Sequence, residues 1–203
     1  MRMIKNVIFD VGKVLVEYDP DSYMERLGFD SKTRQAVNQA MFQNPLWEES
    51  DRGKLSTEEL LEKFIFNDKE YKEEITKAYQ TVGNTIELFP YSVAWIKELK
   101  QRGYRVYILS NYAEITYEQT KEKMEFLPYV DGAVFSFQCK WIKPEREIYE
   151  ELCRKYSIEP RESVFLDDRL DNIEQARNLG FFGIQFESYE QAVKELERIL
   201  NEG

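Results

Sequence analysis

The 203-residue sequence predicts an α/β protein, with a doubly wound parallel sheet and an inserted helical subdomain. Short apolar runs bounded by turn residues alternate with segments of helical periodicity, which is the pattern of a parallel α/β fold. The apolar runs are nearly continuous, as expected for strands that are covered on both faces. Between the first run and Pro90 this alternation stops, and only helical patterns follow one another.

The elements of the predicted core follow in order along the chain. Strands are expected at Asn6–Phe9, Tyr104–Leu109, Ala133–Phe135 (the weakest), Ser163–Leu166 and Phe182–Phe186. A helix is expected between Pro90 and Gly103, because proline favours the first helical turn and glycine favours the stop. The remaining core helices are expected at Glu145–Tyr156, Asn172–Leu179 and Tyr189–Leu200.

The inserted segment begins with strong helix signals. Asp19 precedes Pro20, which places a capping side chain before a proline at the first helical position. Ser31 heads another helix, and Ser56 and Glu59 have the spacing of a capping box. We therefore expect residues 1–16 and 88–203 to form the core domain and residues 17–87 to form a helical cap subdomain.

Composition excludes several classes of protein. With 28 basic and 38 acidic residues the net charge is −10, which argues against a nucleic-acid partner. The apolar runs are too short for a signal peptide or a membrane span, so no membrane partner is expected. Two cysteines, Cys139 and Cys153, suggest the reducing cytoplasm. The absence of histidine removes histidine triads and histidine-ligated zinc sites.

Four polar stretches lie at or near the ends of predicted strands, where ligands bind in open parallel sheets. They are Asp10, Ser110-Asn111, Lys143-Pro144 and Asp167-Asp168. Singly, each has an ordinary explanation as a turn residue, a helix cap or a solvated charge. Together, two carboxylate clusters at neighbouring strand ends would repel each other unless a cation lay between them. Mg²⁺ suits such oxygen ligands, and a hydroxyl and an ammonium at the same edge would bind an anion.

The order of these stretches resembles the haloacid dehalogenase-like (HAD) hydrolase superfamily over essentially the whole chain. Within that superfamily, FDVGKVLVEYD, LWEESDRGKLSTEEL, ILSN, KWIKPEREIY and FLDDRLDNIEQARNLG resemble the bacterial glucose-1-phosphate phosphatase branch. They resemble more distantly the phosphatase domain of soluble epoxide hydrolases. Each motif alone is weak, but their common order is specific.

The resemblance implies a Rossmann-like core, a C1-type helical cap and a Mg²⁺-dependent phosphatase acting on small phosphorylated metabolites. Asp10 would be the nucleophile and form an aspartyl-phosphate. Asp10, Asp168 and the backbone carbonyl of Gly12 would hold Mg²⁺, and Asp167 would support the metal through its water shell.

The remaining roles concern the phosphate group and the substrate. Ser110, Asn111 and Lys143 would bind the phosphate, and Asn172 would support the loop. In the cap, Trp47 and Arg52 are the candidate substrate contacts, although a packing tryptophan and a solvated arginine are equally ordinary. Both a monomer and a homodimer remain open.

Gly12 departs from the family pattern, in which a second aspartate acts as general acid and base. Such catalysis is worth about 10²–10⁴ in rate. One reading is a phosphatase with a good leaving group, such as glucose 1-phosphate, or with protons relayed by Glu17 or Asp19. The alternatives are a metal-independent 2-haloacid dehalogenase and a non-catalytic phospho-ligand-binding protein. The pair Asp167-Asp168 weighs against the dehalogenase.

Overall fold

The central sheet has five parallel strands in the order β5-β4-β1-β6-β7. It belongs to a computed structural model that describes residues 3–201. The strands are β1 (Asn6–Phe9), β4 (Arg105–Ser110), β5 (Gly132–Phe135), β6 (Ser163–Asp167) and β7 (Phe182–Gln185). The predicted α/β class is therefore confirmed, and each expected core strand lies within one residue of its predicted bounds.

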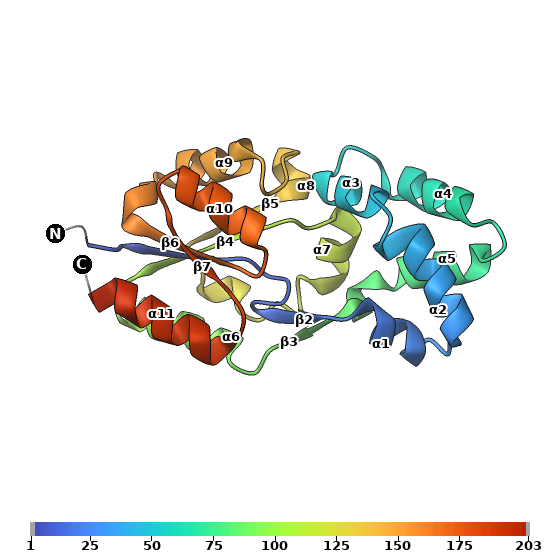
Figure 1. The fold of residues 1–203 in the computed structure, drawn as a ribbon, viewed down its shortest axis with the longest axis horizontal. Coiled ribbons are helices and arrows are strands. Elements are labelled where there is room, and N and C mark those ends of the chain that lie inside the picture. Colours follow the sequence, from blue (N-terminus) through green and yellow to red (C-terminus); the bar gives the residue numbers. More distant parts are fainter. Residues whose placement is uncertain (1–2, 202–203) are drawn as a thin grey trace.

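Helices cover both faces of this sheet (Figure 1). On one face lie α6 (Ser92–Gln101) and α11 (Tyr189–Asn201), and on the other lie α9 (Arg146–Tyr156) and α10 (Leu170–Asn178). Alternate residues of β1 enter the two cores: Phe9 packs edge-on against Trp95, and Ile8 joins the cluster on the opposite face. Burial on both faces explains why the strand is apolar without interruption.

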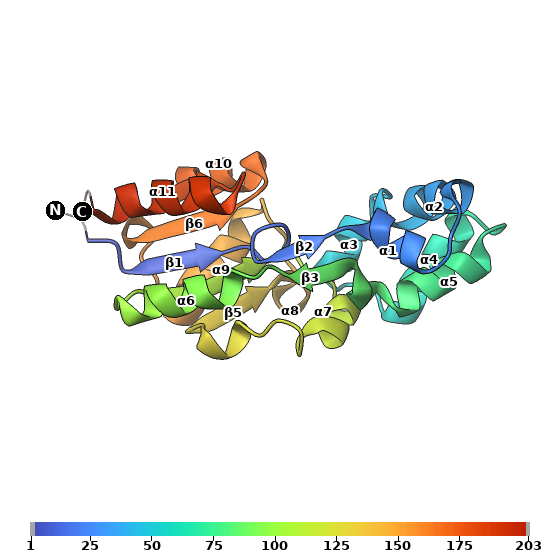
Figure 2. The ribbon, with the colours of Figure 1, turned by 90° about the horizontal axis from the view of Figure 1, so that it is seen from below.

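Five helices form a second body at the end of the molecule opposite the two chain ends, as Figure 2 shows. They are α1 (Pro20–Arg26), α2 (Ser31–Val37), α3 (Leu46–Arg52), α4 (Thr57–Asn67) and α5 (Lys72–Gln80). This body has its own apolar cluster, which includes Tyr23, Phe64 and Tyr79. The predicted helix starts are present: Asp19 accepts a hydrogen bond from the Ser22 amide at 3.0 Å, and Ser56 forms the capping box.

A short antiparallel ribbon joins the two bodies. It pairs β2 (Val16–Tyr18) with β3 (Ile86–Leu88), and the sequence did not predict either strand. Each has three residues, too few to show a period, and their pairing is a long-range contact. Two further short helices beside the junction, α7 (Glu114–Thr120) and α8 (Ser136–Cys139), were also not predicted. None of the helices within residues 3–201 has the length and apolar character needed to cross a bilayer.

Candidate active site

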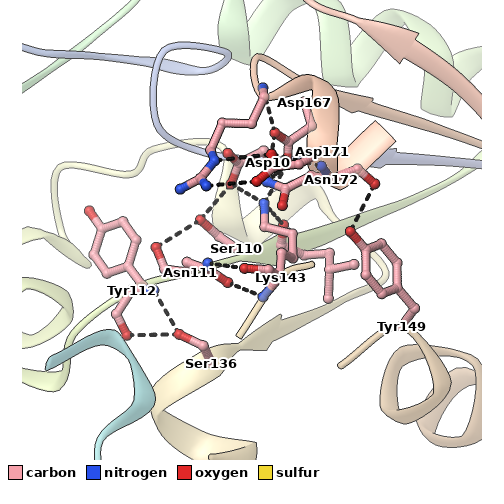
Figure 3. A network of polar contacts seen from close by, with 12 residues as sticks. Asp10, Ser110, Asn111, Tyr112, Ser136, Lys143, Tyr149, Asp167, Asp171 and Asn172 are labelled. Carbon is pink, nitrogen blue, oxygen red and sulfur yellow. Dashed lines mark hydrogen bonds and ion pairs between the residues drawn. The ribbon is translucent and has the colours of Figure 1, made fainter. Parts of the chain in front are cut away.

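The register of the sheet brings the polar stretches together. Phe9 is paired with Ile108 on β4 and with Leu166 on β6, so Asp10 emerges beside the ends of both neighbouring strands. Ser110 is the last residue of β4 and Asp167 is the last residue of β6. Figure 3 shows these side chains meeting at one edge of the sheet.

Lys143 lies at the centre of this group (Figure 3). Its Nζ is 2.9 Å from Oδ1 of Asp10 and 2.6 Å from Oδ2 of Asp167, and it donates a hydrogen bond to the carbonyl of Leu109 at 3.0 Å. Burial by itself would lower the pKa of Lys143, but the two carboxylates outweigh burial and raise this pKa above its ordinary value. The site therefore contains a fixed positive charge.

Asp10 is nearly buried, with 8% of its surface exposed. Its Oδ1 accepts a hydrogen bond from the Ser110 hydroxyl at 2.7 Å and also faces Lys143. Burial raises the pKa of Asp10 to about 6, although Lys143 opposes the shift; Asp167 adds to it. Because both contacts use the same oxygen, the other carboxylate oxygen remains available for a metal ion or an electrophile.

Asp167 is fully buried and its carboxylate is saturated with partners. Asn172 donates to both carboxylate oxygens at 2.9 and 3.0 Å, and the amide of Arg169 donates to Oδ1 at 2.9 Å. The Tyr149 hydroxyl in turn donates to the carbonyl of Asn172 at 2.9 Å (Figure 3). In this structure Asp167 thus orients Lys143, and Asn172 orients Asp167.

Asn111 holds the chain segment that carries Lys143. Its side-chain amide donates to the Lys143 carbonyl at 3.0 Å, and its Oδ1 accepts from the Lys143 amide at 2.7 Å. This double contact joins the end of β4 to the Lys143 segment. Asn111 also lines the cavity in front of Asp10.

The acidic residues are suited to a hard divalent cation. Asp10, Asp167 and Asp168 each offer an oxygen, and these oxygens all lie within 4.8 Å of one another. The carboxylate of Asp168 has fewer close partners than that of Asp167, because its ion pair with Lys13 is long at 3.8 Å. Burial, with a contribution from Asp167, raises the pKa of Asp168. A set of carboxylate oxygens beside a cavity matches the preference of Mg²⁺, so these residues fit the ion.

A cavity of about 510 Å³ opens in front of Asp10 and is walled by both the sheet core and the helical body of α1 to α5, here called the cap. Its charged lining residues are four acids (Asp10, Glu48, Asp51 and Asp168) and three bases (Lys13, Lys143 and Arg169). One divalent cation would add two positive charges to this lining, which suits an anionic ligand. A smaller adjoining cavity of about 150 Å³ also contains Asp10.

The two candidate cap contacts lie in different places. Trp47 lines both cavities and also packs against Phe42, with ring centroids 4.9 Å apart, so it serves the cap core and the cavity wall. Among the described residues that line either cavity, Arg52 is not found. Its guanidinium binds Glu145 of the core at 2.7 Å and Glu49 at 3.4 Å, which ties the cap to the core.

The structure also separates the candidate proton donors. Glu17 is exposed on β2, and Asp19 caps α1 through Ser22, whose hydrogen bonds lower the pKa of Asp19. Neither is among the described residues that line the cavities. Asp51 does line them, and the sequence reasoning missed it. The sequence around Asp51 does not mark it as a site residue, because only the packing of α3 on the core decides which way the last turn of α3 faces.

Lys13 and Arg169 were missed for a different reason. Each directly follows a recognised site residue or motif, yet an exposed basic side chain has no distinctive sequence pattern. Arg169 pairs with Glu48 of the cap at 3.3 Å and with Asp171 at 2.7 Å. It therefore lies where core and cap meet at the mouth of the cavity.

This fold and this arrangement of aspartates, serine and lysine define a hydrolase of the HAD type. The chain belongs to the haloacid dehalogenase-like hydrolase family, whose model matches residues 4–180. It is 30% identical to D-ribitol-5-phosphate phosphatase of Bacteroides thetaiotaomicron, over 98% of this chain and 100% of the relative. The superfamily predicted from the sequence is confirmed.

Solved structures share the fold at lower sequence identity. A HAD family enzyme from Bacteroides thetaiotaomicron, in complex with magnesium and inorganic phosphate, matches with a TM-score of 0.72 and 22% identity, over 93% of this chain and 98% of that one. L-2-haloacid dehalogenase from Xanthobacter autotrophicus, with chloropropionic acid covalently bound, matches with a TM-score of 0.64 and 17% identity, over 97% and 83%. Both likenesses concern the fold alone.

Proposed function

We propose that the protein is a magnesium-dependent phosphatase that hydrolyses small phosphorylated metabolites, with sugar and polyol phosphates favoured. The observation that carries this proposal is that Asp10, Lys143 and Asp168 line one cavity, while the Ser110 hydroxyl is hydrogen-bonded to Asp10 beside it. The relative named D-ribitol-5-phosphate phosphatase and the related fold crystallised with magnesium and phosphate support it. Glucose 1-phosphate remains one candidate substrate.

In the first step, the Ser110 hydroxyl and the Lys143 ammonium bind the phosphoryl oxygens. An oxygen of Asp10 attacks phosphorus, the bond from phosphorus to the ester oxygen breaks, and an aspartyl-phosphate forms. In the second step, water attacks the same phosphorus and releases inorganic phosphate and the Asp10 carboxylate. Lys143 stays in place throughout, because Asp167 and the Leu109 carbonyl hold its ammonium at 2.6 and 3.0 Å.

Asp10, Asp168 and the backbone carbonyl of Gly12 are the groups that would hold Mg²⁺, with Asp167 behind them. When bound, the ion supplies the positive charge that lets an anionic carboxylate approach an anionic phosphate. The ion also adds positive charge to a lining that contains several acids, which makes the cavity more attractive to an anionic substrate.

We further propose residues 17–87 as the cap that closes this cavity and excludes water during the reaction. Polar contacts that connect cap and core include Arg52 with Glu145 at 2.7 Å, Arg169 with Glu48 at 3.3 Å, and the Lys140 ammonium with the Gly53 carbonyl at 2.5 Å.

The direct test is release of inorganic phosphate from an activated aryl phosphate by the purified protein with Mg²⁺. Activity should disappear in Asp10→Asn and in EDTA, and should return when Mg²⁺ is restored. Halide release from a 2-haloacid that is indifferent to EDTA would instead indicate the dehalogenase. Affinity for phosphorylated ligands without turnover across a broad panel would indicate a binding protein.

A further inference from the structure

Gly12 leaves the reaction without the side chain that would protonate the leaving group. A Cβ built on Gly12 meets no atom within 4 Å, so the place beside Asp10 where such a side chain would lie is open space. If the protein is a phosphatase, as proposed above, an alcohol leaving group needs a proton from elsewhere. The donor must reach this open space.

Asp51 lines the same two cavities as Gly12. It belongs to the last turn of α3, and Asp10 also lines both the larger cavity and the smaller one. Among the described residues, Asp10 and Asp51 are the two carboxylic acids common to both cavities. Asp10 is the nucleophile, so Asp51 is the acid that remains.

The end of α3 is anchored to the core, which fixes the position of Asp51. Its own backbone carbonyl accepts a hydrogen bond from the Ser136 hydroxyl at 2.5 Å, and Ser136 in turn accepts from the amide of Tyr112 at 2.8 Å. The next residue, Arg52, binds Glu145 of the core. Gly53 follows in close contact with Phe137. These contacts join the cap to α8 and, through Ser136, to Tyr112, which follows Ser110 and the end of β4 by two residues.

The surroundings of Asp51 keep a proton on it near neutral pH. Burial, followed by the charges of Glu48 and Asp10, raises the pKa of Asp51 to about 8, while Lys143 and the backbone at Ala113 oppose the shift. The phenols of Tyr18 and Tyr112 line the same small cavity and stay neutral, because burial raises their own pKa values. A carboxylic acid held neutral can donate to a leaving oxygen.

We propose that Asp51, supplied by the cap, is the general acid and base that Gly12 does not provide. As Asp10 attacks phosphorus, the electron pair of the breaking bond stays on the ester oxygen, and the Asp51 carboxyl gives that oxygen its proton. The Asp51 carboxylate then takes a proton from the water that attacks the aspartyl-phosphate. Phosphate leaves, Asp10 is regenerated, and Asp51 is protonated again.

The test compares two substrates in Asp51→Asn: an aryl phosphate with an acidic phenol, and a sugar or polyol phosphate. Loss of the acid should lower kcat/KM on the alkyl ester by about 10²–10⁴, and considerably less on the aryl ester, whose leaving group needs no proton. Trapped aspartyl-phosphate, measured by mass spectrometry, should increase in the variant because its hydrolysis lacks the base. Glu73→Gln, a change at an exposed acid of the cap helix α5, is the matched control and should behave as the wild type.

Two further readouts separate catalysis from packing. With the alkyl ester, wild-type kcat/KM should fall as the pH rises through about 8, when Asp51 loses its proton, and Asp51→Asn should lack this decline. Adding Gly12→Asp to Asp51→Asn should restore part of the alkyl-ester activity, since the space at Gly12 is open.

The outcomes distinguish the two proposals. A wild type that hydrolyses no phosphate ester would overturn the phosphatase itself. An active wild type with equal losses on both esters in Asp51→Asn, or with none, would overturn the role of Asp51 alone.

Discussion

Replacing Lys143 with methionine removes a buried positive charge from between two carboxylates. The Lys143 side chain is 1% exposed, and those of Asp167 and Asp10 are 0% and 12% exposed. Breaking such a buried pair from one side costs about 3–5 kcal/mol, because the remaining charges stay unpaired away from water. At about 2–4 °C per kcal/mol for a chain of this size, we expect Tm to fall by about 6–20 °C.

The pH dependence of this loss has a definite sign. Lys143 lowers the folded-state pKa of Asp10, so without the ammonium this pKa moves still further above the unfolded value of about 3.9. A raised carboxyl pKa costs stability as the pH rises from the unfolded toward the folded value, and costs nothing below both. The Tm deficit should therefore be larger at pH 7 than at pH 5.

Thermal unfolding followed by circular dichroism in EDTA measures this loss, because no added cation then replaces the ammonium. Lys194→Met, at an exposed lysine of α11, controls for the chemical change. A Tm for Lys143→Met within about 2 °C of the wild type at pH 7, or a deficit as large at pH 5, would contradict the reasoning.

Two further changes can be measured on the same instrument. Gly53→Ala should lower the free energy of unfolding by about 1–3 kcal/mol more than Gly103→Ala. Both glycines have positive φ, but a Cβ on Gly53 would lie 2.8 Å from the Phe137 carbonyl oxygen, whereas a Cβ on Gly103 meets no atom within 4 Å. Equal losses of unfolding free energy would contradict the steric argument. Mg²⁺ at about 100 times its Kd should stabilise the wild type by about 2.7 kcal/mol. Asp168→Asn should weaken this effect and Glu174→Gln should not; an equal Mg²⁺ response in all three would rule out Asp168 as a ligand.

Gly12 and Asp51 show the limit of motif reading at this site. Gly12 lacks the acid of the family pattern, and from the sequence Glu17 or Asp19 was suggested as a proton relay at the boundary of the cap. The structure instead places Asp51 in the cavity lining, from α3 in the middle of the inserted segment. Neither Glu17 nor Asp19 is among the described cavity-lining residues: Glu17 is exposed on the β2–β3 ribbon, and Asp19 caps α1.

Arg52 gives the complementary case. Its charge and its motif suggested a contact with the substrate, but the side chain reaches Glu145 of the core and lies outside the cavity lining that the structure describes. Successive side chains of an α-helix point about 100° apart, so Asp51 on α3 can face the cavity while Arg52, the next residue, reaches Glu145.

The sequence by itself determined the parallel sheet and its helices α6, α9, α10 and α11, and it pointed to Asp10, Ser110, Lys143 and Asp168 as candidates, because buried strands need continuous apolar runs and their ends expose polar groups at fixed places. These apolar runs and the polar residues at their ends are local patterns, so they can be recognised without knowledge of the fold. Tertiary structure decided how the cap meets the core. It thereby placed Asp51 at the cavity and Arg52 away from it, because that choice depends on long-range packing of α3 against α8, which no local pattern encodes.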